Sequence, residues 1–134
     1  MLYEIDSDLG KITLDNAVIG SIIIQEATAT EGKIILCSAK GKPIKQPVKR
    51  NGEDGSFFDL SWNKGDLDII IYVIVKLGGS ITTIAEGFNE RLGKTINGLL
   101  GLQPKSITVN IKGILSKNIS DRDIKITKNT NEYI

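Results

Sequence analysis

An uninterrupted apolar run near the middle of the chain constrains the fold more than any other feature. The run extends from Ile69 to Val75 and is followed by the glycine pair Gly78-Gly79. It is far shorter than the roughly 20 apolar residues that a membrane-spanning helix requires. A short apolar run of this kind is typical of a strand that is covered on both faces. We therefore expect a strand over residues 67–77 in the middle of a sheet.

Three further segments predict strands that would pair around this one. Residues 58–63 alternate between apolar and polar, which is typical of a strand with one wet face, and residues 63–66 can turn it into a hairpin with the central strand. Residues 33–39 hold a short apolar run between glycines. Residues 107–112 alternate again and predict the last strong strand.

Two segments show the apolar spacing of amphipathic helices. The first follows Asp15 and Asn16, which can supply an N-cap oxygen, and we expect it over residues 16–30. The second follows Ser80, a further capping residue, and its apolar stripe runs on to Leu99. Ahead of the first helix, residues 11–14 alternate and allow a short N-terminal strand.

These elements predict an α+β fold in the order helix, three strands, helix, strand. Both helical stripes need an apolar surface, so we expect two helices packed on one face of a small mixed sheet of about four strands. Residues 1–116 would form a single domain, since a chain of 134 residues supports one core. Residues 117–134 are polar, and we interpret them as a C-terminal tail, with disorder as one option.

The residues that commonly carry catalysis are scarce in this chain. It has no histidine, which removes the commonest general base and metal ligand. The acid pairs Asp6 with Asp8 and Asp121 with Asp123 lie in polar segments, where a solvated role is favoured. Cys37 is the sole cysteine, which excludes an intrachain disulfide and fits a reducing cytosol, and without an activating neighbour it should be structural. We expect no catalytic residue, no cofactor and no metal site.

Two glycine-containing segments have ligand-binding counterparts elsewhere. Gly78-Gly79 precedes a helix, but no glycine-lysine-serine or threonine motif follows it, so we interpret it as a turn. The tetrapeptide 98–101 matches the two-glycine loop of nucleic-acid-binding KH domains, although its centre is apolar and a glycine helix stop is the simpler interpretation. The net charge is +1, from 17 basic and 16 acidic residues, and gives no global attraction to nucleic acid.

One local patch of positive charge is a candidate binding surface. It comprises Lys40, Lys42, Lys45, Lys49 and Arg50, with no acid among them. Such a run fits a solvated loop, which we expect to be extended, and it also fits contact with an anionic surface such as phospholipid or an acidic partner.

A second candidate is one face of the central strand, occupied by Ile70, Tyr72 and Ile74. The two helices would cover only the opposite face, so this one needs its own cover. A second subunit could supply it, which predicts self-association through the sheet, and residues 41–55 folded back on the sheet are the alternative.

Several of these segments resemble the alkaline-shock, general-stress protein family of Gram-positive bacteria. The N-terminal resemblance lies in residues 10–14 and in Glu31-Gly32 after the first helix. The closer resemblance lies in residues 68–75 and 107–114, the latter around Val109-Asn110-Ile111. It covers about residues 10–115 and is carried mainly by apolar patterning.

The resemblance implies a cytosolic protein of the envelope stress response without known enzymatic activity. It further implies self-assembly into a homo-oligomer and recruitment by a small membrane-anchored protein, so that membrane contact is indirect and peripheral, at the inner face of the cell membrane. A regulator bound to an enzyme of fatty-acid synthesis is the alternative, and a KH-like nucleic-acid binder is the third. A neighbouring membrane-anchor gene would favour the first, and neighbouring acyl-metabolism genes would favour the second.

Overall fold

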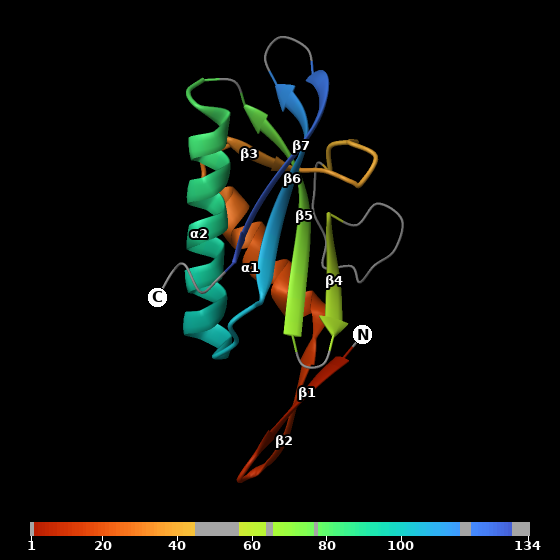
Figure 1. Cartoon of the computed structure of the whole chain (residues 1–134), viewed down its shortest axis with the longest axis vertical. Coiled ribbons are helices and arrows are strands. Elements are labelled where there is room, and N and C mark those ends of the chain that lie inside the picture. Colours follow the sequence, from red (N-terminus) through yellow and green to blue (C-terminus); the bar gives the residue numbers. More distant parts are fainter. Residues whose placement is uncertain (1, 45–56, 64–65, 77, 116–118, 130–134) are drawn as a thin grey trace.

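The structure is a computed structural model and describes residues 2–44, 57–63, 66–76, 78–115 and 119–129. Within these ranges both helices pack on one face of a mixed sheet, which confirms the predicted α+β fold (Figure 1). In chain order the elements are β1 (Leu2–Ser7), β2 (Gly10–Asp15), α1 (Asn16–Thr28), β3 (Ile34–Leu36), β4 (Phe58–Asn63), β5 (Asp66–Lys76), α2 (Ile81–Leu100), β6 (Ser106–Leu115) and β7 (Ile119–Asn129).

Strand β5 is the middle of the sheet, as its continuous apolar run predicts. One of its edges pairs in parallel with β6. The other edge is shared, because β4 runs antiparallel to residues 66–71 and β3 runs antiparallel to residues 73–75. Ile69, Ile71 and Val73 have no exposed surface and point into the core that the helices cover.

The prediction of a polar tail over residues 117–134 was wrong for most of that segment. Residues 119–129 form β7, which pairs antiparallel with β6 along nearly all of that strand and makes the sheet five-stranded. Ile126 packs against the core. The physical reason is that an edge strand needs apolar residues on one face only, so its sequence can be mostly polar, as this segment is.

The N-terminal segment forms an arm, defined as the β1–β2 hairpin of residues 2–15. The predicted short strand exists as β2, but it pairs only with β1, in a two-stranded sheet separate from the main one. Figure 1 shows the arm projecting beyond the body from the start of α1. Asp15 ends the arm and caps the helix, since its Oδ1 accepts a hydrogen bond from the Ala17 N–H at 3.1 Å.

The core lies between the sheet and the two helices. Helix α1 contributes Ile19, Ile22 and Ile23, and α2 contributes apolar residues at the predicted helical spacing, namely Ala85, Phe88, Leu92 and Ile96. Asn89 is a fully buried polar residue of α2, and its Nδ2 donates to the carbonyl oxygen of Ile107 at 2.8 Å. This hydrogen bond satisfies the amide and ties α2 to β6.

Gly20 lies where α1 packs closely on Phe58 of β4. A Cβ at this position would lie 3.0 Å from Cε1 of Phe58, whose ring is buried and packs on Phe57 with 4.9 Å between centroids. Because the ring is buried and packed on Phe57, we expect Gly20→Ala to lower the free energy of unfolding by about 1–3 kcal/mol. Urea denaturation measures the change.

Gly98→Ala is the matched control for this prediction. It lies on α2, is exposed, and an added Cβ there would meet no atom within 4 Å. Alanine is favoured over glycine in a helix by up to about 1 kcal/mol, so this variant should gain stability. Equal effects of the two substitutions would contradict the close approach at Gly20.

Candidate functional site

The face of the sheet opposite the helices is partly covered by the chain itself. Ile70 and Tyr72 are half-buried, whereas Ile74 has no exposed surface. The predicted interface role is therefore wrong for Ile74 in this conformation, since it has no surface to offer. For Ile70 and Tyr72 it stays a prediction. The Tyr72 hydroxyl donates to Oδ2 of Asp59 at 2.5 Å, across the β4–β5 pair.

The turn that follows β3 folds back against the sheet. The Cys37 N–H donates to the Tyr72 carbonyl at 3.0 Å and extends the β3–β5 pairing by one residue. The Tyr72 N–H donates to the Phe57 carbonyl, so the next part of this edge of β5 is occupied by the segment that leads into β4. The chain therefore leaves the sheet after Cys37. A Cβ on Gly41 would lie 3.5 Å from Cβ of Lys112, so the turn rests on β6. Of the residues 41–55 that were the folded-back alternative, only 41–44 are described, and they lie on the side of the sheet away from the helices (Figure 1). For the rest of that segment the alternative stays a prediction.

Cys37 is enclosed under this turn. It has no exposed surface, and desolvation raises the pKa of its thiol to about 12, although the positive charge of Lys112 acts in the opposite direction. A thiol that holds its proton so firmly is a poor nucleophile and a poor metal ligand. The geometry agrees with the expected structural role.

The predicted positive patch is only partly placed. Lys40 and Lys42 are exposed, and both backbone N–H groups donate to Oγ of Ser38, at 3.3 and 3.2 Å. This part of the patch is a tight turn and not the extended loop that we expected. Lys45, Lys49 and Arg50 lie outside the described residues.

The KH-like interpretation of residues 98–101 was wrong. Gly98 lies within α2, and Gly101 is its left-handed C-cap, with φ of 67° and its N–H donating to the Asn97 carbonyl at 2.9 Å. Residues 98–101 therefore form the end of a helix, as the glycine-stop alternative predicted, and they are not a loop between two helices.

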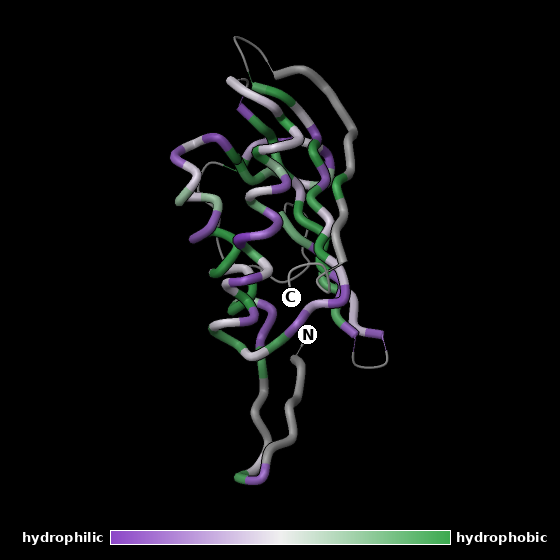
Figure 2. The backbone as a smooth tube through the Cα atoms, turned by 60° about the vertical axis from the view of Figure 1, so that its left-hand side comes forward, coloured by the Kyte–Doolittle hydropathy of each residue, from purple (hydrophilic) through white to green (hydrophobic). Residues whose placement is uncertain are grey.

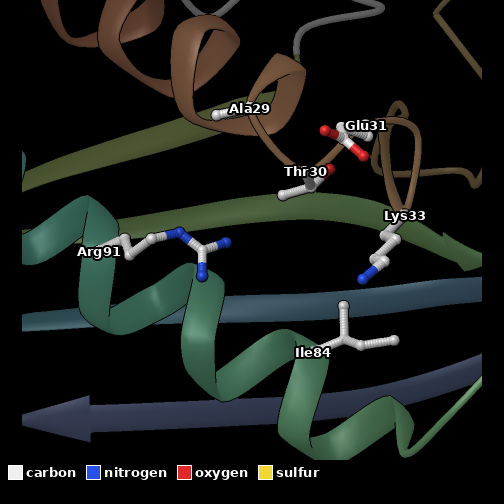
Figure 3. Close-up of a pocket in the computed structure, with 6 residues that line it drawn as sticks. All are labelled: Ala29, Thr30, Glu31, Lys33, Ile84 and Arg91. Carbon is white, nitrogen blue, oxygen red and sulfur yellow. The ribbon is translucent and has the colours of Figure 1, made fainter.

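A shallow pocket lies between the end of α1 and the middle of α2. Its volume is about 220 Å³, and Figure 3 shows six lining residues: Ala29, Thr30, Glu31, Lys33, Ile84 and Arg91. Small-molecule pockets usually measure about 300–1,000 Å³. This pocket therefore fits one or two protein side chains better than a cofactor.

The wall on the α1 side is a rigid turn. Oγ1 of Thr30 donates to the Ala27 carbonyl at 2.6 Å and accepts from the Ile34 N–H at 3.0 Å. Glu31 and Gly32 follow with positive φ values of 58° and 88°. A left-handed conformation costs a residue with a side chain about 1–2 kcal/mol, and this conformation places the Glu31 carboxylate at the rim.

The opposite wall is formed by α2 and carries Arg91 above Ile84. The Arg91 side chain lies back over Gly87, where an added Cβ would come within 3.3 Å of Nη1. In Figure 3 the Arg91 guanidinium and the Lys33 ammonium approach the pocket from opposite sides. Neither forms an ion pair with another described residue, so both charges are available to a ligand.

Sequence reasoning missed this pocket. Lys33 and Arg91 are far apart in the chain and neither belongs to a motif. One signal was present in the sequence. Gly87 lies one turn before Arg91, and glycine is unfavourable in the interior of a helix. The glycine makes room for the arginine side chain.

The fold is that of a small α+β domain. A protein-family model matches residues 4–116, and the chain belongs to this family, the alkaline shock protein family, which has a cell envelope-related function. The match confirms the predicted family. No curated protein and no solved structure gives a significant match. No helix in the described part of the chain is long and apolar enough to cross a membrane.

Proposed function

We propose that this protein is a non-catalytic scaffold or adaptor with a cell envelope-related role. It acts by self-association and by binding a small membrane-anchored protein. The observation that carries the proposal is the arm, a two-stranded sheet that projects from the body and pairs with no strand of the main sheet. An isolated hairpin is marginally stable in water, so an arm of this kind gains stability by docking on another protein surface.

In this proposal the protein lies in the cytoplasm, and its contact with the inner face of the membrane is indirect. Lys40 and Lys42 are exposed. Each basic residue near an anionic membrane surface contributes about 1 kcal/mol, and the attraction falls off within a Debye length. Such charges assist recruitment, while the protein partner provides the attachment.

Light scattering of the purified full chain tests the self-association. We expect a mass above the 14.6 kDa of one chain that rises with protein concentration. A strict monomer at all concentrations would refute this part of the proposal.

A pull-down from native cells tests the partner in the same preparation. Recovery of a membrane protein supports the adaptor. Recovery of an enzyme of acyl metabolism in its place would support the alternative regulator and overturn the adaptor.

A further inference from the structure

The tip of the arm combines an apolar side chain with a negative charge. Leu9 is fully exposed, at 100%, and Asp8 beside it is also exposed. Figure 2 shows the tip coloured both hydrophobic and hydrophilic. The arm as a whole carries four acids against one base, a net charge of −3: Glu4, Asp6, Asp8 and Asp15 against Lys11.

The pocket has the complementary composition. Lys33 and Arg91 give it two positive charges, Glu31 subtracts one, and the sum is +1. Ile84 and Ala29 provide an apolar lining between the charges. The volume of about 220 Å³ accommodates a leucine side chain together with an adjacent carboxylate, and it is too small for most organic ligands.

An arm cannot reach the pocket of its own chain. The arm leaves the body at the start of α1, whereas the pocket lies beyond the other end of that helix. The 13 residues of α1 span about 20 Å. The six-residue strands of the arm add about 20 Å in the opposite direction (Figure 1). Contact between tip and pocket must therefore join two copies.

We propose that the arm tip of one copy docks in the Lys33–Arg91 pocket of a second copy, with Leu9 against Ile84 and Asp8 facing the two cations. The inference deepens the proposed self-association and rests on it. The two surfaces are different, so the contact is head-to-tail, and it adds copies in a row unless the row closes into a ring. The contact is small, and its strength should depend on protein concentration and salt.

Two variants remove the contact from opposite sides. The tip variant carries Asp8→Ser and Leu9→Ser, and the pocket variant carries Arg91→Glu. All three side chains are exposed, so circular dichroism should match the unchanged chain. Light scattering should give the 14.6 kDa monomer for each variant alone. An equimolar mixture should give a dimer and nothing larger, because only one intact tip and pocket can meet.

Lys94→Glu is the matched control. Lys94 is an exposed base on the same helix outside the pocket, so this variant should keep the mass of the unchanged chain. If the unchanged chain self-associates while the pocket variant keeps its mass, the docking contact is wrong and the proposed function stands. The pocket variant could instead keep the mass of the unchanged chain and fail to recover a partner in the pull-down from native cells. This result would mean that the pocket binds that partner, and it would also overturn the inference. A monomeric unchanged chain would overturn the docking contact together with the proposed self-association.

Discussion

Removal of residues 116–134 is expected to lower the free energy of unfolding by more than about 3 kcal/mol. The truncation deletes β7, which pairs with β6 from Ser106 to Leu115. Each backbone hydrogen bond contributes a net 0.5–1.5 kcal/mol, roughly, and several would be lost together with the packing of Ile126. It would also leave β6, an apolar strand, as an exposed edge that favours aggregation. Urea denaturation followed by the fluorescence of Trp62, the sole tryptophan, measures the loss.

The matched control removes residues 130–134 alone and leaves β7 intact. Its unfolding curve should coincide with that of the full chain. If the longer truncation also coincides, residues 119–129 behave as the dispensable tail that the sequence suggested, and β7 contributes no stability. The family match ends at residue 116, so this experiment also tells whether the matched segment needs the strand beyond it.

The elements with strong local signals could be predicted from the sequence. The apolar run of β5 and the alternation in β4 depend on burial of one or both strand faces, which the residue order displays directly. The cap residues Asp15 and Ser80 were correctly predicted because capping needs only an oxygen placed next to the first turn. The edge strands β1 and β7 were missed since an edge strand carries few apolar residues and many charges, which is also the composition of a tail.

The candidate site was less predictable because it is made of contacts between distant segments. Lys33 and Arg91 approach the same pocket only after α1 and α2 pack on one face of the sheet. Ile74 was expected on an exposed face of the sheet, but it is buried. The course of the chain after β3 depends on where β3 stops pairing with β5. The spacing of apolar residues along the chain does not show where this pairing stops. Charge and exposure could be estimated residue by residue, but the pairing of surfaces required the fold.

Alkaline conditions should destabilise this protein through the buried Cys37 and the half-buried Tyr72. Desolvation raises the pKa of Cys37 from the ordinary 9.0 to about 12. Desolvation, the hydrogen bond to Asp59 and the charge of Asp59 raise the pKa of Tyr72 from 10.0 to about 12. Between pH 9 and pH 12 the unfolded chain therefore holds fewer protons than the folded chain. The stabilisation by the neutral thiol is complete below pH 9 and is lost as the pH rises toward 12.

The comparison of the unchanged chain with Cys37→Ala isolates this effect. Below pH 9 the two free energies of unfolding should differ by a constant, because the variant only loses the packing of a buried sulfur. Above pH 9 the unchanged chain should fall faster, by up to about 1.4 kcal/mol for each pH unit, so the difference narrows. Urea denaturation in buffers from about pH 8 to about pH 11 provides the two curves. Parallel curves over this range would show that the thiol titrates no differently in the folded chain, and that the turn of residues 38–44 does not exclude solvent from Cys37.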